Sequence, residues 1–317
     1  MPIISFADKT YTLNENESIL ECLIRHGINY PHSCQVGVCQ SCLIKGRGTI
    51  NPAWQEGIQD TLKTQGYFLA CLAKPKEDIQ LTVPFASECE IEAKIDDIKK
   101  LTYNVIQVKL YVKNLAPWTP GQYLNLINSE GIIRSYSIAN IPNQDGFIEL
   151  HIKLEEQGLM GEWFKKTAHV NNLISIRGPL GRCFYFNPNK LTYDILLVGT
   201  GTGLSPLIGI AKQALFQNHQ GKITLLHGGR IFEDLYYVNE LEKIASENSD
   251  FHYENCVWKN ASGEYNLPID KVVLKYIQDP KNLRVFVCGP QETTQKIKTK
   301  VFCAGVPSSQ ILSDAFI

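Results

Sequence analysis

The sequence lacks the features expected of a membrane-embedded or nucleic-acid-binding chain. The formal net charge over 317 residues is only −1, which gives no electrostatic reason to expect nucleic acid or an anionic membrane as a partner. No apolar run reaches the ~18 residues that a transmembrane helix needs. The start, MPIISFADKTYTL, has no basic segment followed by an apolar one, so we expect no signal peptide and a cytoplasmic location.

Internal repeats and low-complexity segments are also missing, and no convincing Ser/His/Asp or paired-carboxylate site is present. What is present is typical of a globular protein, with 44% hydrophobic and 20% charged residues. A chain of this length predicts two or three domains, because a single hydrophobic core rarely grows so large.

The ten cysteines do not indicate a disulfide scaffold, which belongs to short secreted chains. Four of them are grouped with a motif spacing and six are scattered. We interpret five of the scattered cysteines as structural: Cys22, Cys89, Cys183, Cys256 and Cys303. Cys288 has distinctive neighbours and is treated separately below.

The four grouped cysteines predict an iron–sulfur site. Cys34, Cys39 and Cys42 lie in HSCQVGVCQSC, and Cys71 lies in YFLACLA. The spacing C-x4-C-x2-C with a distant fourth cysteine is that of plant-type 2Fe–2S clusters. Gly37 is expected to avoid crowding the cluster, and backbone N–H groups of the loop to point at the sulfurs.

Two other interpretations of these cysteines remain open. Zinc could use Cys39 and Cys42 together with His32 and Cys34, and the thiols could also be merely structural. Zinc sites usually pair two short knuckles, however, and Cys71 has no second Cys or His beside it. The pattern therefore favours iron and sulfide.

Three segments with different patterns predict three domains, at 1–88, 89–190 and 191–317. The first reads as a small α+β domain, with a hairpin turning at Asp8 and Lys9 and a helix from about Glu17 to His26, for which Asn14 is the possible cap and Gly27 the end. The second has strands with turn signals every eight to twelve residues, which predicts an antiparallel β-barrel or sandwich with one helical insert.

The third segment alternates strands and helices, which predicts a doubly wound α/β domain with a parallel sheet covered on both faces. Its expected strands are DILLVGT, KITLLHG, FHYENCV and LRVFVCG. Its helices are expected near 204–216, 234–247 and 292–302.

A flavin site is predicted in the barrel segment at Arg134, Ser135, Tyr136 and Ser137. An Arg can pair with a pyrophosphate, a Tyr ring can stack on the isoalloxazine, and a Ser hydroxyl can bind its edge. Alone, these four residues also fit an ordinary barrel surface.

A later part of the same segment offers further contacts to the flavin cofactor. The helix that begins near Gly158 and Gly161 adds an anion site at its N-terminus. His151 and Lys153, two apart on one strand, are candidates for neutralising the cofactor, although both also fit a solvated edge.

A nicotinamide dinucleotide site is predicted in the third segment. A strand–loop–helix run contains Gly199, Thr200, Gly201, Thr202 and Gly203. Glycines there let a pyrophosphate approach a helix N-terminus, although the spacing departs from the usual G-x-G-x-x-G.

A second loop is expected to flank the same nucleotide. Cys288, Gly289 and Pro290 end another buried strand, at the sheet edge where such domains bind ligands. Arg230 follows ITLLHGG, the next strand after the glycine loop, and is placed to read the adenosine ribose. NADH is preferred as the electron donor, and NADPH stays open.

Taken together, the motifs resemble a known family. CQVGVCQSC with LAC resembles plant-type ferredoxins, and RSYS, GTGTGLSP and CGP resemble the ferredoxin–NADP reductase superfamily. With the ferredoxin part first, the order resembles reductase components of bacterial multicomponent oxygenases and of related deoxysugar-forming systems. The resemblance covers essentially the whole chain and implies a β-grasp ferredoxin domain, a flavin barrel and a nucleotide-binding domain.

The resemblance also implies roles for single residues. Arg134, Tyr136 and Ser137 would hold FAD, and residues 199–202 the dinucleotide. Cys288 would lie beside the nicotinamide, and in the SDAFI tail Phe316 would cover the flavin with Asp314 two residues earlier. The family usually has Ser or Thr where this chain has Gly161, so backbone N–H groups would replace a hydroxyl there.

The expected activity is electron transfer from a nicotinamide through FAD and a 2Fe–2S cluster to a partner protein, with the redox chemistry supplied by the cofactors. The partner is expected to be a terminal oxygenase or, alternatively, another acceptor such as a deoxysugar-forming dehydrase. A zinc-stabilised binding module fused to a flavoprotein is the alternative from another class. We expect a monomer, with neither nucleic acid nor membrane as a partner.

Overall fold

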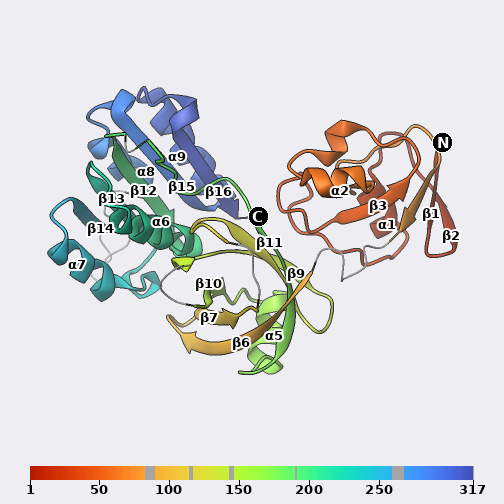
Figure 1. The fold of residues 1–317 in the computed structure, drawn as a ribbon, viewed down its shortest axis with the longest axis horizontal. Coiled ribbons are helices and arrows are strands. Elements are labelled where there is room, and N and C mark those ends of the chain that lie inside the picture. The colour runs from red at the N-terminus through yellow and green to blue at the C-terminus, as the bar shows by residue number, and fades with distance from the viewer. Residues whose placement is uncertain (83–89, 114–116, 143–145, 190, 259–267, 317) are drawn as a thin grey trace. The chain divides into compact units, whose positions relative to one another are not determined.

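The computed structural model describes residues 1–82, 90–113, 117–142, 146–189, 191–258 and 268–316 (Figure 1). The expected boundary at 88/89, Cys89, residue 190 and the last residue of the SDAFI tail lie outside the described residues. Contacts divide the chain into two compact units. The first comprises Met1–Ile91, Asn125–Ser135 and Ser175–Arg177, and the second comprises Glu92–Leu124, Tyr136–Ile174 and Gly178–Ile317.

The N-terminal part of the first unit is a mixed five-stranded sheet with two short α-helices, a β-grasp arrangement. Its strand order is β2-β1-β5-β3-β4, with β1 and β5 parallel and the other neighbouring pairs antiparallel. The elements are β1 (Ile3–Phe6), β2 (Lys9–Thr12), α1 (Ile19–Arg25), β3 (Leu43–Arg47), η1 (Pro52–Gln55), α2 (Asp60–Thr64), β4 (Tyr67–Leu69) and β5 (Ile79–Thr82). Tyr67 and Phe68, both fully buried, lie in its core.

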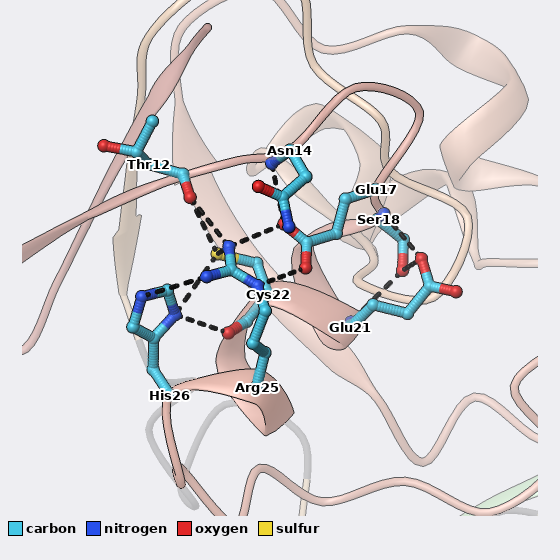
Figure 2. A network of polar contacts seen from close by, with 8 residues as sticks. All are labelled: Thr12, Asn14, Glu17, Ser18, Glu21, Cys22, Arg25 and His26. Atoms are coloured by element: carbon cyan, nitrogen blue, oxygen red, sulfur yellow. Dashed lines mark hydrogen bonds and ion pairs between the residues drawn. The ribbon is translucent and has the colours of Figure 1, made fainter.

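Helix α1 begins at a different cap from the one expected. The N-cap is Ser18, whose hydroxyl accepts from the backbone N–H of Glu21 while the Glu21 carboxylate accepts from the N–H of Ser18, a complete capping box. Asn14 instead donates its backbone N–H to Glu17, which forms an ion pair with Arg25 at 2.7 Å (Figure 2). The Asn14 prediction was wrong, because Ser18 offers the same chemistry closer to the first helical residue.

The hairpin between β1 and β2 turns one residue earlier than expected. Ala7 and Asp8 both have positive φ, 50° and 60°, which is the conformation of a two-residue type I′ turn. The glycine after α1 fulfils its expected role, since Gly27 has φ +74° and nothing lies within 4 Å of a Cβ built on it.

The middle of the chain forms the predicted antiparallel barrel. The six strands are β6 (Ile91–Lys100), β7 (Val105–Tyr111), β8 (Tyr123–Ile127), β9 (Ile133–Ser137), β10 (Ile148–Lys153) and β11 (Leu173–Leu180). Their order is β10-β7-β6-β11-β8-β9, and a bridge between Ile138 and Leu150 joins the two outer strands. Helix α5 (Leu159–Lys166) is the predicted insert.

The last third forms the predicted doubly wound sheet, which lies in the second unit. All neighbouring strands are parallel, in the order β14-β13-β12-β15-β16. They are β12 (Asp194–Thr200), β13 (Ile223–Gly229), β14 (Phe251–Val257), β15 (Leu283–Pro290) and β16 (Ile311–Phe316), and the α-helices are α6 (Leu204–Phe216), α7 (Val238–Glu247), α8 (Ile269–Val272) and α9 (Gln291–Cys303). Short 3-10 turns occur at Gly201–Gly203, Phe232–Asp234, Val273–Tyr276, Pro280–Asn282 and Ser308–Gln310.

Alternation along β12 explains the two layers of helices. Leu197 packs in one core with side chains of α6 and α7, and Leu196 packs in another with side chains of α8 and α9. Successive strand residues point to opposite faces, so a run of apolar residues is buried on both. Among the described residues, no helix has the length and apolar character needed to cross a membrane.

Candidate cofactor sites

The cysteine loop has an unusual backbone. Gln35, Gly37 and Gln40 all have positive φ, at 56°, 82° and 57°. Left-handed residues other than glycine cost free energy and cluster at functional sites. Here they turn the chain so that the N–H groups of Val36, Val38 and Cys39 donate to the Cys34 sulfur at 3.5, 3.4 and 3.3 Å.

The four thiols interact in two pairs, Cys34 with Cys39 and Cys42 with Cys71. The hydrogen bond from Cys39, together with the backbone N–H groups, lowers the pKa of Cys34 to about 5. The hydrogen bond from Cys42 likewise lowers the pKa of Cys71. Two thiols per pair suit a cluster of two irons, whose four ligands are divided between the metals, and a thiolate is the form that ligates iron.

Other features of the loop fit the same group. The hydroxyl of Ser41 is buried and has no hydrogen-bond partner of regular geometry among the described residues, so a cluster sulfur would offer it an acceptor. Gly37 has φ +82°, in the left-handed region that favours glycine. A Cβ there would lie 2.6 Å from Cδ1 of Leu72, so the glycine lets Leu72 pack on the loop.

Strand β9 carries the predicted flavin residues. Arg134, Ser135 and Tyr136 are partly exposed, and Ser137 is buried at the end of the strand. The Ser135 hydroxyl donates to the side-chain oxygen of Asn125 at 2.7 Å, and the Arg134 guanidinium to the carbonyl of Ile133 at 2.7 Å. Strand β9 thus presents a cation and an aromatic ring, both partly exposed, which are groups that suit a flavin cofactor.

Ser137, Asp314 and Cys288 come together from three strands of the second unit. The Ser137 hydroxyl donates to Asp314 Oδ2 at 2.9 Å, and Asp314 lies opposite Cys288 in the pairing of β15 with β16. Phe316 lies opposite Pro290 in the same register. Burial raises the pKa of Asp314, and the bond from Ser137 opposes this only in part. The site therefore holds a carboxyl group that can exchange a proton.

Cys183 lies beside Cys288, which the sequence did not indicate. Their sulfurs are 3.8 Å apart, and both residues are buried. Burial, with the hydrogen bond between Cys288 and Cys183 next in importance, raises the pKa of Cys288. The Cys288 side chain is therefore a neutral thiol, a small polarisable group, and not a thiolate nucleophile.

The glycine loop after β12 is shaped by close contacts with β15. A Cβ at Gly203 would lie 2.1 Å from the carbonyl oxygen of Cys288, and one at Gly199 would lie 2.7 Å from Leu207. Gly201 has φ +55° and open space around it. The glycines therefore bring the start of α6 against the strand that carries Cys288, as expected for two loops that flank one ligand.

Thr200 is enclosed by two further glycines. A Cβ at Gly289 would lie 2.7 Å from the Thr200 hydroxyl, and a Cβ at Gly228 would lie 2.7 Å from its methyl group. Thr202 follows within the 3-10 turn Gly201–Gly203, and Pro290 is the N-cap residue of α9. Gly228 and Gly289 are thus explained by the close packing of the ends of β12, β13 and β15 around Thr200.

Arg230 is exposed and follows β13 directly. Its backbone N–H donates to Asp234 Oδ2 at 3.0 Å, and so does that of Ile231. Asp234 thereby folds the segment after β13 into a compact turn. The Arg230 side chain, at the carboxyl end of the sheet, is accessible to a nucleotide.

The remaining predicted contacts to the flavin cofactor differ in accessibility. Lys153 is exposed and pairs with Glu155 at 2.6 Å; Gly158 is the N-cap residue of α5, and Gly161 lies in its first turn. His151 instead has a fully buried side chain, and both ring nitrogens have partners within the protein. We therefore assign His151 no contact with a cofactor.

Sequence reasoning missed the surroundings of His151. Glu149, Tyr236, Tyr237 and Gln107 form a buried polar cluster with it. The one available signal was Glu149 and His151 at strand spacing within an otherwise apolar run, since polar residues at buried strand positions need partners.

Comparison with known families and proteins agrees with these three sites. Residues 5–76 match the family described as 2Fe-2S iron-sulfur cluster binding domain, residues 92–185 the oxidoreductase FAD-binding domain, and residues 197–299 the oxidoreductase NAD-binding domain. The chain is a ferredoxin–NADP reductase-type flavoprotein with an N-terminal 2Fe–2S domain. Its cofactors are a 2Fe–2S cluster, FAD and NAD(H), and it is an NAD(P)H-dependent oxidoreductase. The iron–sulfur prediction is confirmed over zinc.

Relatives match this chain over almost the whole length of both sequences. The toluate 1,2-dioxygenase electron transfer component of Pseudomonas putida is 28% identical, with 96% of this chain and 93% of the relative covered. A CDP-6-deoxy-L-threo-D-glycero-4-hexulose-3-dehydrase reductase of Yersinia pestis is 26% identical, covering 97% and 95%. The Amycolatopsis cytochrome P450 reductase GcoB has the same fold, with a TM-score of 0.69 at 22% identity, and 100% of this chain and 99% of that one covered.

Proposed function

We propose that this ferredoxin–NADP reductase-type flavoprotein is the reductase component of a multicomponent oxygenase, and that it passes electrons from NADH through FAD and the 2Fe–2S cluster to a terminal oxygenase. The order of three cofactor domains along one chain carries the proposal. It is supported by relatives described as electron transfer components of dioxygenases that match over almost their whole length. We further propose domain limits of 1–88, 89–190 and 191–317, a monomer, and a cytoplasmic location with access to NADH.

The chain's own residues would bind and orient the cofactors. Arg134 and Tyr136 of β9 would contact the pyrophosphate and the ring of FAD, with Lys153 and the N-terminus of α5 as further contacts. Cys34, Cys39, Cys42 and Cys71 would ligate the cluster. When bound, FAD accepts a hydride and the cluster passes electrons on singly.

The nucleotide would approach the strand ends of the parallel sheet. The glycine loop at 199–203 and Gly289 offer backbone to the pyrophosphate, and Arg230 offers a cation to the adenosine side. Cys288 and Phe316 would lie at the nicotinamide end. The buried neutral thiol of Cys288 fits a site from which water and competing nucleophiles are excluded.

Ser137 and Asp314 would handle the proton. A hydride carries one proton and two electrons, so the proton must be released once the electrons have been passed on. The raised pKa of Asp314 makes this carboxyl group a suitable acceptor, and the Ser137 hydroxyl, bonded to it, is a suitable relay.

Replacing one cluster ligand tests the route. Cys42→Ser should abolish NADH-dependent reduction of a one-electron protein acceptor, by at least about a hundredfold, because electrons then lack their exit from the flavin. NADH oxidation with a dye that accepts electrons from the flavin should persist. A folded, FAD-loaded Cys42→Ser protein that lost the dye reaction as well would contradict the proposed route.

The acceptor has a second candidate. A relative described as the reductase of a deoxysugar-forming dehydrase covers as much of the chain as the dioxygenase components do, at similar identity. Purified terminal oxygenase and dehydrase proteins can be offered in parallel with NADH. Reduction of the oxygenase alone supports the proposal, and reduction of the dehydrase alone overturns it.

A further inference from the structure

A buried polar cluster joins the barrel to the parallel-sheet domain within the second unit. Glu149 and His151 come from β10, Gln107 comes from the neighbouring β7, and Tyr236 and Tyr237 directly precede α7. His151 Nε2 lies 2.8 Å from Glu149 Oε1, and Nδ1 lies 3.1 Å from the Tyr236 hydroxyl. The Tyr237 hydroxyl is 2.9 Å from the same Glu149 oxygen and also bonds to Gln107.

The cluster has one consistent pattern of protons. Burial alone would raise the pKa of Glu149, but hydrogen bonds from His151, Gln107 and Tyr237 outweigh it and lower the pKa to about 2, so the group is a carboxylate. Burial lowers the pKa of His151, so its ring is neutral at pH 7. A carboxylate only accepts, so Nε2 of His151 carries the proton, and Nδ1 then accepts from Tyr236.

The backbone at this place is held in a costly conformation. Tyr237 has φ 59° and ψ 20°, in the left-handed region, and no side chain caps α7 there. Such a conformation persists in a non-glycine residue only when its surroundings enforce it. The bonds of the Tyr237 hydroxyl to Glu149 and Gln107 hold its side chain in place and so help to maintain this conformation.

The cluster fixes one end of the segment that carries Arg230. The Tyr236 ring packs edge-on between His151 of the barrel and His227 of β13, at centroid distances of 5.2 and 5.7 Å. The middle of the segment is bonded to the barrel too, because the Tyr103 hydroxyl donates to Asp234 Oδ1 at 2.9 Å, and Asp234 in turn accepts from the N–H of Arg230. The segment from 230 to 237 is thus held to the barrel at two points.

We propose that this cluster is a positioning device for the nicotinamide dinucleotide. By holding residues 230–237 to the flavin barrel, it places the Arg230 side chain where the adenosine half of the coenzyme binds. Glu149, His151, Tyr236 and Tyr237 are then positioning residues that act through Arg230 and touch no cofactor themselves. The inference rests on the adenosine-side role proposed for Arg230, and it does not depend on the identity of the electron acceptor.

The test compares tyrosines of the second unit in the full-length, cofactor-loaded protein. Tyr236→Phe and Tyr237→Phe each remove one hydroxyl from the cluster. Tyr193→Phe is the matched control, since Tyr193 is also buried in the second unit and its hydroxyl accepts a hydrogen bond from Arg284, just before β12 at the opposite end of the sheet from Arg230. ADP-ribose, which has the adenosine half and no nicotinamide, serves as the probe, with binding measured by calorimetry.

We expect the dissociation constant of ADP-ribose and the KM for NADH to rise together, by about tenfold, in both cluster variants. The kcat for dye reduction and the FAD content should stay within about twofold of wild type, and Tyr193→Phe should change none of these values. An unchanged ADP-ribose affinity in both cluster variants would overturn the proposal. An equal loss in Tyr193→Phe would also overturn it, because the effect would then be one of general destabilisation.

Tyr103→Phe provides a second, milder test in case the Tyr236 and Tyr237 variants do not fold. Tyr103→Phe removes only the exposed bond to Asp234 and leaves the core intact. It should weaken ADP-ribose binding by about twofold to threefold. Should the buried variants fail to fold, wild-type affinity in Tyr103→Phe would count against the two-point attachment.

Discussion

Two carboxyl groups of the second unit, the buried Glu149 and the half-buried Asp314, are opposite in their affinity for a proton. Within the described part of the chain, the Asp314 carboxyl group accepts one hydrogen bond, from Ser137, and burial raises its pKa. Glu149 is bonded to His151 and Tyr237 and receives a further contribution from Gln107, and its pKa is lowered to about 2.

The difference shows that the number of hydrogen-bond donors decides whether the pKa of each group is lowered or raised, since burial acts to raise both. The carboxyl group with several donors is a fixed anion suited to holding structure. The one with a single hydroxyl donor can change its protonation, and it lies in the proposed site of electron transfer. The hydrogen-bond donors around a carboxyl group thus indicate whether it has a structural role, as for Glu149, or a chemical one, as proposed for Asp314.

The comparison is tested most strongly at Glu149. Glu149→Ala should lower the free energy of unfolding by about 3 kcal/mol, because it leaves the His151 N–H and the Tyr237 hydroxyl without their buried acceptor. The ordinary pKa of Glu is 4.5 and the folded value is about 2, so the carboxylate's contribution is present above pH 4.5 and is lost as the pH falls toward 2.

Urea unfolding of wild type and Glu149→Ala across this pH range measures the effect. The difference between the two proteins should shrink steadily below pH 4.5. Glu149→Gln, which keeps one acceptor oxygen, should lose less stability than the alanine variant at pH 7. A difference that stays constant with pH would show that folding does not lower the pKa of Glu149.

Asp314→Asn should act in the opposite direction on stability. The folded pKa of Asp314 lies above its ordinary value of 3.8, so its favourable contribution is present below pH 3.8 and is lost as the pH rises through the folded pKa. Removing the charge should therefore stabilise the protein at pH 7, by about 1 kcal/mol. Electron transfer to the acceptor should fall about tenfold, because an amide accepts no proton. Thermal unfolding and steady-state kinetics on the same preparation test both parts, and a variant that is less stable but fully active would contradict the assignment.

The smallest expected effect is that of Ser137→Ala. Loss of the one hydroxyl donor should raise the pKa of Asp314 further, so the pH dependence of acceptor reduction should move upward. We expect the rate at pH 7 to fall by about threefold, less than the loss in Asp314→Asn. A profile that moved to lower pH would show that Ser137 does not stabilise the ionised form.

Much of this fold could be predicted from the sequence, because its patterns are local. Strands β12 and β14 and helix α6 were predicted with the bounds that the structure has, since each is a run of one periodicity between clear turn signals. Strand β16 was not predicted as a strand. Its residues are partly exposed and ILSDAF has no strong alternation, so its pairing with β15 is what makes it a strand.

The candidate sites differ in the same way: those built from neighbouring residues could be predicted from the sequence, and those built from distant residues could not. The thiols of the cluster loop were found because three of the four lie within nine residues, and the spacing itself carries the chemistry. The cluster around Glu149 could not be found, because its members are brought together from positions 107, 149, 151, 236 and 237 by the packing of two domains. The contact of Cys183 with Cys288 was missed for the same reason, since 105 residues separate them.

The contacts around Thr200 have a consequence for protein engineering. Gly203 leaves no room for a side chain against Cys288, and Gly228 and Gly289 leave none against Thr200. A library that varies one of these loops alone would return mostly inactive variants, because the backbone of each loop is in close contact with residues of the others. Attempts to change the coenzyme preference should therefore diversify residues 199–203, 228 and 288–289 together, as a single unit of selection.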